Sequence, residues 1–370
     1  MSWRCCYTRS SARNNMDLAL SSHSTRTRVI LGGLGILLLA VVLLSLTIGA
    51  MQIPVQEVTL VLLRRFGLFA NHEVNTAHEA VLTTIRFPRV AMTLLIGAAL
   101  GVSGASLQGL FRNPLVEPSI IGVSGGAAAT VVTLIVFGST LLTSLSFWMH
   151  NALVSVAAFS GGALATFLVL RLGSQAGKTN ITVLVLMGVA INALTGAFIG
   201  LAVFYADEKQ LSTFLFWTLG DLGGASWDQL KIAAPLLIFS VAGQLLFSSA
   251  LNALALGEAE AYHLGVDVER TKRFLIVLCA IGVGVSVSLA GIIGFVGLVV
   301  PHVIRTSFHS DNALVLPASV LGGALLLLIA DIIARTVARP AELPIGVVTA
   351  LIGSPFFMLL LLQAKRKHEL

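Results

Sequence analysis

The chain has 370 residues, of which 56% are hydrophobic and only 11% are charged. Soluble globular proteins carry about 25% charged residues. The charges in this chain are too few to cover the surface of a water-soluble protein of 38.8 kDa. Composition excludes a soluble enzyme of two or three domains and predicts an all-α polytopic membrane protein. The net charge of +6 does not indicate nucleic-acid binding, because the basic residues lie in short clusters between apolar runs.

The first 28 residues are polar, basic and rich in serine. We expect them to form a disordered cytoplasmic tail, since the apolar run that follows is too long for a secretory signal. Residues 29–364 form the predicted transmembrane domain and residues 365–370 a cytoplasmic C-terminal tail. The cysteines Cys5, Cys6 and Cys279 form no CxxC pair and no even set, so neither a disulfide framework nor a zinc site is expected.

Runs of about 20 residues without Asp, Glu, Lys or Arg are long enough to cross a bilayer. The run Pro118–Leu170 exceeds twice that length, so it predicts a hairpin with its turn in Gly138–His150. Single crossings are predicted for Val29–Met51, Val90–Phe111, Thr179–Ala206, Ile232–Leu256, Asn312–Ala330 and Leu343–Ala364.

The run Phe274–Ile304 is too long for one upright crossing and contains three glycines in Gly291–Gly297, followed by Pro301. We expect a full helix to about Leu289, a break, and a short returning helix. Irregular backbone at membrane depth must face protein or a cavity. The total is then ten crossings, which places both termini on one side. With the termini inside, internal segments hold fifteen of the 23 basic residues, so both termini are predicted to be cytoplasmic.

Two inner segments carry further information. Arg112–Pro118 contains two prolines and an asparagine and predicts a tight inner loop, either a plain turn or the lining of the inner mouth of a path. Leu254–Val266 is amphipathic, with acids directly after Gly257, which is typical of a helix N-terminus. A helix lying on the membrane is the alternative, but its acids would be repelled by anionic lipid. A soluble protein partner is therefore favoured.

Basic residues also lie at predicted outer ends, in Arg86–Arg89 and at Arg335 and Arg339. They either reach lipid phosphates or form a docking surface for an acidic partner. Only Asp331 and Glu117 approach the membrane interior as acids, and no metalloprotease, Ser/His/Asp or Walker motif occurs. An intramembrane enzyme and an ion-coupled carrier that works alone are both disfavoured. A permease energised by another subunit remains.

Six motifs follow one another in the order that is typical of one transporter family: Arg86–Arg89, Gly104–Gln108, Arg112–Leu115, Leu256–Glu258, Gly294–His302 and Ala341–Thr349. With them, residues 28–364 resemble the permeases of type II ATP-binding-cassette importers for iron-siderophores, haem and cobalamin. The resemblance implies a ten-helix subunit that works as a homodimer in the bacterial inner membrane. It also implies two cytoplasmic ATPases, which carry the ATP, and a periplasmic binding protein. No permanently bound cofactor or metal is expected.

The resemblance also implies site residues. Residues 254–270 would form the coupling helices on the ATPase, and the helix Ile181–Tyr205 would line the path at the dimer axis. Binding-protein docking would fall to Arg86, Arg89 and Arg335. The cytoplasmic gate would comprise Asn113, Leu115, Asn180, Ile181 and Thr182. Coupling would use Leu256, Gly257, Glu258, Ala261, Leu264 and Gly265.

Two loops, Arg112–Pro118 and Phe216–Trp227, look most similar to the haem branch, so haem is the expected substrate. Import of a ferric siderophore or of cobalamin is the alternative within the family. The outer histidines His72, His78 and His150 are not expected to ligate haem, because a path for permeation needs weak binding.

Overall fold

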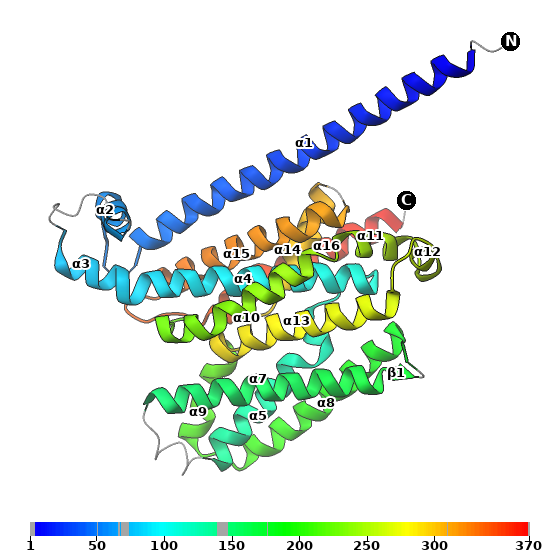
Figure 1. Cartoon of the computed structure of the whole chain (residues 1–370). Coiled ribbons are helices and arrows are strands. Elements are labelled where there is room, and N and C mark those ends of the chain that lie inside the picture. Colours follow the sequence, from blue (N-terminus) through cyan, green and yellow to red (C-terminus); the bar gives the residue numbers. More distant parts are fainter. Residues whose placement is uncertain are drawn as a thin grey trace.

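The computed structural model of the chain describes residues 4–49, 51–65, 67, 74–138, 147–175, 177–308 and 310–368. Nearly all of them are helical, and the long helices run side by side in a layered bundle (Figure 1). The one hairpin among these residues pairs β1 (Ser174–Gln175) with β2 (Lys178–Thr179) in antiparallel register. The predicted all-α class is therefore confirmed.

The helices have the following bounds: α1 Arg4–Thr47, α2 Val55–Arg65, α3 Thr76–Val81, η1 Leu82–Arg86, α4 Phe87–Phe111, η2 Pro118–Ile121, α5 Val123–Phe137, α7 Phe147–Leu172, α8 Ile181–Phe204, α9 Glu208–Leu219, α10 Trp227–Leu245, α11 Ser248–Leu256, α12 Glu258–His263, α13 Val268–Ala290, α14 Val296–Ser307, α15 Asn312–Val337 and α16 Ile345–His368.

Within the described residues, six helices are long and apolar enough to cross a membrane: α1, α3 with α4, α7, α8, α13 and α15. The pair α10 and α11, bent by 45°, makes a seventh if it counts as one span. The three other predicted crossings fall on shorter helices: α5 and the first part of α16, which are apolar, and α14, which has 12 residues. That these three helices also cross the membrane, which would make ten crossings, therefore stays a prediction.

Helix α4 lies at the centre of the bundle because small residues let its neighbours approach closely. A Cβ atom on Gly97 would lie 2.5 Å from the Gly323 carbonyl oxygen of α15. A Cβ on Gly104 would overlap the Gly297 carbonyl of α14. In lipid, such close backbone packing is a main source of helix association. The glycines of α4 thus fix α14 and α15 against it.

The predicted break in the run Phe274–Ile304 is confirmed. Helix α13 ends at Ala290 and α14 begins at Val296. Gly291 and Phe295 both have positive φ, 69° and 67°. Gly291 is suited to this conformation, and a Cβ there would also overlap the Trp217 carbonyl oxygen. The break is therefore packed against protein at Gly291, while Ile292, Gly294 and Phe295 line an open pocket. Non-helical backbone at membrane depth is tolerated in both of these settings.

Two expectations about connecting segments met different outcomes. Helix α1 begins at Arg4, so most of the segment expected to be a disordered tail continues the first span as helix. Extending an existing helix costs little free energy, because only its nucleation is unfavourable.

The predicted hairpin turn lies between the end of α5 at Phe137 and the first turn of α7, which starts at Phe147. Residues 139–146 of that turn lie outside the described residues.

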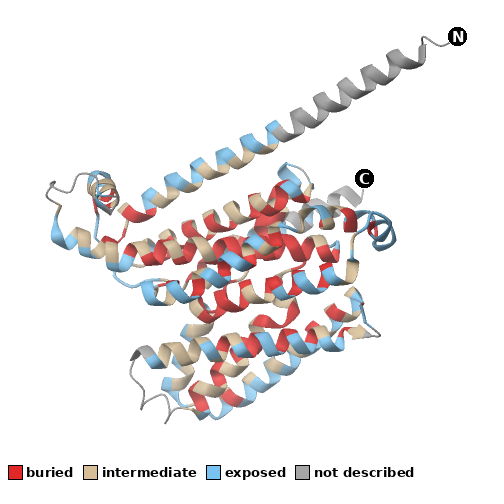
Figure 2. Cartoon of the chain, in the orientation of Figure 1, coloured by how far each residue is buried: buried red, intermediate tan, exposed pale blue. Residues whose placement is uncertain are grey.

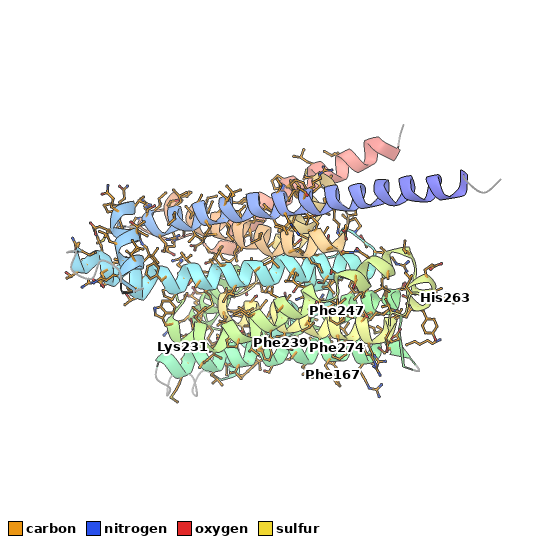
Figure 3. All side chains as sticks on the ribbon, turned by 45° about the horizontal axis from the view of Figure 1, so that its top comes forward. Phe167, Lys231, Phe239, Phe247, His263 and Phe274 are labelled. Atoms are coloured by element: carbon orange, nitrogen blue, oxygen red, sulfur yellow. The ribbon has the colours of Figure 1, made fainter. Side chains whose placement is uncertain are left out.

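Burial divides the bundle into a core and a lipid-facing shell. Buried residues concentrate in α4, α13, α14 and α15, and exposed ones on α1, α8 and α9 (Figure 2). Lys231 and His263 lie at opposite ends of the bundle, with Phe239, Phe274 and Phe167 between them (Figure 3). These three phenylalanines are 58–60% exposed. The side of the bundle between its two polar ends is therefore apolar, as contact with lipid requires.

Candidate transport path and coupling site

The predicted docking arginines come together at one end of the bundle, but their side chains are buried. Arg86, Arg89 and Arg335 are only 4%, 6% and 7% exposed. The guanidinium of Arg86 donates to the carbonyl oxygens of Leu46, in the last turn of α1, and of Met51, which follows that helix. The structure thus brings the three residues together and engages them within the chain.

Asp331 is the centre of this cluster. Its carboxylate is fully buried and pairs with Arg89 at 2.9 Å and with Arg335 at 3.0 Å. Arg89 also pairs with Glu342 at 2.8 Å, and Arg335 donates to the Ser45 hydroxyl at 2.7 Å. One ion cluster therefore ties α1, α4 and α15 to the segment before α16. The i, i+4 spacing of Asp331 and Arg335 was the available sequence signal for this pairing.

The predicted inner loop follows the end of α4. Arg112 closes the helix with a positive φ of 50°. The Asn113 side chain then accepts a hydrogen bond from the Leu115 amide at 2.9 Å. Both residues are exposed, Leu115 by 45%. Glu117 accepts a bond at 2.9 Å from the amide of Phe295 at the start of α14. The loop is thereby fixed to the broken helix, while the residues predicted to form the gate stay accessible.

The other predicted gate residues start α8. Asn180 caps this helix, accepting hydrogen bonds from the Thr182 amide at 3.0 Å and the Val183 amide at 3.3 Å. Asn180, Ile181 and Thr182 line one open pocket with Arg112 and Glu258. The pocket therefore joins part of the predicted gate to part of the predicted coupling segment. Asn113 and Leu115 do not line it.

The predicted coupling segment forms two short helices joined at Gly257, whose φ of 141° suits only glycine. Leu256 and Leu264 are 69% and 63% exposed, whereas Ala261 is fully buried. The segment thus rests on the bundle through Ala261 and presents its leucines outward. Helix α12 projects at the same end of the bundle as the start of α1 and the end of α16 (Figure 1). Its exposed side remains the predicted contact for a soluble partner.

Sequence reasoning missed one residue of this region. Lys272 on α13 is only 2% exposed, and its ammonium group pairs with Glu258 at 2.8 Å and with Glu269 at 3.2 Å. A lysine within the first turns of a span is ordinarily expected at the membrane surface. Its spacing of three from Glu269 was the available signal, but only the fold brings Glu258 to it.

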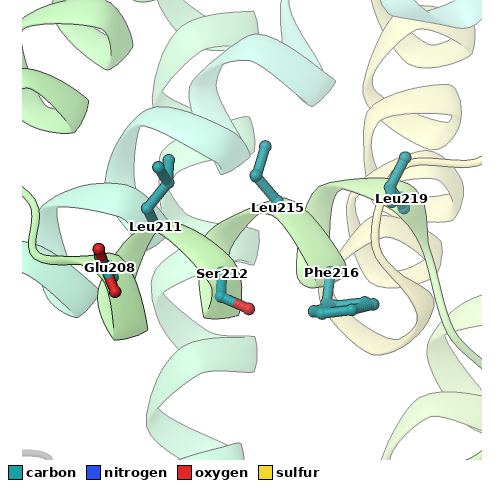
Figure 4. A pocket seen from close by; sticks show the side chains of 6 residues that line it. All are labelled: Glu208, Leu211, Ser212, Leu215, Phe216 and Leu219. Atoms are coloured by element: carbon teal, nitrogen blue, oxygen red, sulfur yellow. The ribbon is translucent and has the colours of Figure 1, made fainter.

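An apolar face on α8 and α9 is left uncovered by the residues that the structure describes. Only 17% of the apolar window of α8 is buried. An open apolar groove runs along α9, with Leu211, Leu215 and Leu219 on one side of the helix (Figure 4). Exposed large side chains on α8 include Leu186, Val189, Leu194, Phe198, Leu201 and Phe204. This face is available to lipid or to another apolar surface.

Comparison with known proteins shows the family to which the chain belongs. Residues 37–363 match the FecCD transport family. The chain is a member of that family. It is 40% identical to the hemin transport system permease HmuU of Yersinia pestis, over 92% of this chain and 98% of that protein. Its identity to the cobalamin import permease BtuC of Halobacterium salinarum is 36%, over 88% and 94% of the two chains.

A solved structure agrees with this assignment. A metal-chelate type ABC transporter in an inward-facing conformation superposes with a TM-score of 0.77 and 31% identity, over 90% of this chain and 99% of that one. The FecCD permease described here is therefore a multi-span inner-membrane subunit of an ABC importer. Its relatives are transport permeases and not enzymes, and type II ABC permeases work with ATPase and substrate-binding partners.

Proposed function

We propose that this permease moves haem from the periplasm to the cytoplasm. The observation that carries the proposal is the 40% identity to a hemin permease over nearly the whole of both chains. Haem is large and mostly apolar, so a path walled by the leucines and phenylalanines of α8 suits it. ATP bound by the partner ATPases would switch the permease between two packings, because it binds one of them more tightly.

The path would form between two copies of the chain, with both termini of each copy in the cytoplasm. Support for a homodimer comes from the uncovered apolar face of α8, where Gly196 and Gly200 have open space in front of them. Small residues four apart allow two helix backbones to approach each other in lipid. A second copy placed against this face would enclose a path lined by α8.

Each end of the permease would meet a different partner. An ATPase subunit would bind the exposed leucines of α11 and α12, and the gate would comprise Asn113 with Leu115 and the start of α8. The periplasmic binding protein would dock at the end that carries the Asp331 cluster. Glu342 is 45% exposed at its side chain, so acids of a binding protein could compete with it for Arg89.

Uptake by proteoliposomes tests the proposal. They would contain the permease with the ATPase and binding protein encoded beside it, and haem would be the first substrate. ATP-dependent haem accumulation is the expected result. Failure with haem, while the binding protein still stimulates ATP hydrolysis, would refute haem as the substrate.

Cobalamin is the second candidate, because permeases for it are 36–38% identical to this chain. The same proteoliposomes, supplied with cobalamin or a ferric siderophore, would decide between these substrates. Uptake of either without haem uptake would replace haem in the proposal.

A further inference from the structure

Lys272 carries a buried positive charge whose hydrogen bonds are all satisfied. Its ammonium group has three N–H donors, and three acceptors surround it. They are Glu258 Oε2 at 2.8 Å, the Thr179 carbonyl oxygen at 3.0 Å and Glu269 Oε1 at 3.2 Å. A buried charge is stable only when it is paired and hydrogen-bonded in this way. The side chain is therefore fixed in one position.

The three acceptors come from three segments of the chain. Glu258 is the first residue of α12, Thr179 is the last residue of β2, and Glu269 lies on α13 with Lys272 itself. One ammonium group thus joins α12 to the β1–β2 hairpin that leads into α8, although Thr179 and Glu258 are 79 positions apart in the sequence. Among the described residues, no other side chain bonds to both α12 and this hairpin.

Thr179 is bound on both sides of its backbone. Its carbonyl accepts from Lys272, and its amide donates to Glu269 Oε2 at 2.8 Å. The next residue is Asn180, which caps α8. The residue before the cap of α8 is therefore held by two side chains of α13, one of which also bonds to α12.

The two carboxylates differ in how readily they can leave the lysine. Glu258 is 43% exposed at its side chain and Glu269 is 30% exposed. Because Lys272 bonds to both Glu258 and the Thr179 carbonyl, a movement of α12 would displace the ammonium group and with it Thr179. Water can solvate the exposed Glu258 if it leaves the lysine, and the reverse movement would restore the third bond. Passing on a movement requires an element with two such arrangements.

We propose that Lys272 is a positioning residue that transmits movement of α12 to the start of α8. The inference rests on the proposed function, because it takes α12 as the ATPase contact and α8 as the wall of the path. It adds that α12 acts on the start of α8 through Lys272.

The test follows the gate and does not depend on the substrate. In the complex of permease, ATPase and binding protein, Thr182→Cys is labelled by a thiol reagent with and without ATP, after replacement of the three native cysteines. Thr182 is exposed and lies beside the cap of α8. Coupling between sites is commonly 5- to 150-fold, so we expect Lys272→Met to reduce the ATP-dependent change in labelling rate by about tenfold. ATP hydrolysis should continue.

The matched control is Arg171→Met, which removes an exposed cation of α7 outside the cluster. It should leave the response to ATP unchanged. Glu258→Gln retains Lys272 with its other acceptors and should give an intermediate response, which keeps the test available if Lys272→Met does not fold. An unchanged ATP response in both cluster variants would overturn the inference. Loss of the response only in the cluster variants would support it, even if haem is not the substrate.

Discussion

Replacement of Asp331 by asparagine tests the buried ion cluster most directly. The substitution keeps the shape of the side chain and removes the charge shared by two guanidinium groups at 2.9 and 3.0 Å. Arg89 keeps its second carboxylate, Glu342. Arg335 keeps only neutral acceptors, the Ser45 hydroxyl and the backbone carbonyls of Ile48 and of residue 331 itself. It would become a buried charge without a directly paired carboxylate.

Removing one partner of a buried ion pair costs about 3–5 kcal/mol, and the neutral acceptors of Arg335 place this case near about 3 kcal/mol. At about 1.4 kcal/mol per factor of ten, the unfolding equilibrium constant should rise roughly a hundredfold. The matched control is Glu342→Gln. Its carboxylate is 45% exposed, so screening by water should keep its effect below about 1 kcal/mol.

The assay is equilibrium unfolding of the purified permease in mixed detergent micelles, followed by a probe of tertiary structure. Asp331→Asn should lower the free energy of unfolding by several times as much as Glu342→Gln. Equal effects of the two variants would refute the reasoning, since they would show that burial does not strengthen this pairing. A stabilised Asp331→Asn protein would refute it as well.

Three further predictions follow from particular contacts. Gly104→Ala forces a Cβ into the Gly297 carbonyl and should cost about 1–3 kcal/mol of stability in detergent. The control Gly32→Ala has open space around its Cβ and should stabilise α1 by up to about 1 kcal/mol. Equal effects of the two variants would contradict this packing. Asn180→Ala removes the cap of α8 and should cost about 1 kcal/mol in the same assay, and no change would show that the cap contributes nothing. Leu115→Cys should change its labelling rate when ATP is added to the complex, and constant labelling would indicate a plain turn.

Much of this architecture could be predicted because membrane helices have simple requirements. Long uncharged runs predicted the helices, and glycines with Pro301 predicted the break that separates α13 from α14. Gly257 followed by acids predicted the start of α12. In each case a local property of the backbone or of its solvent decides the structure.

Helices such as α2 and α9 were not predicted, because they carry charges and are too short to give the signal of a span. The first 28 residues were expected to be disordered, but helix α1 extends back through them to Arg4. The gate residues were named from motifs, and the structure places only those at the start of α8 in a pocket with Glu258.

By itself the sequence determined the membrane environment, the helical class and the family, because composition, run length and motif order are properties of the chain alone. Only the tertiary structure decided where the charged side chains go. Arg89 meets Asp331 and Lys272 meets Glu258 through packing between distant helices. The same arginines and lysine, judged from sequence, fit a surface equally well. Burial and pairing depend on which helices are neighbours, and no local pattern specifies that.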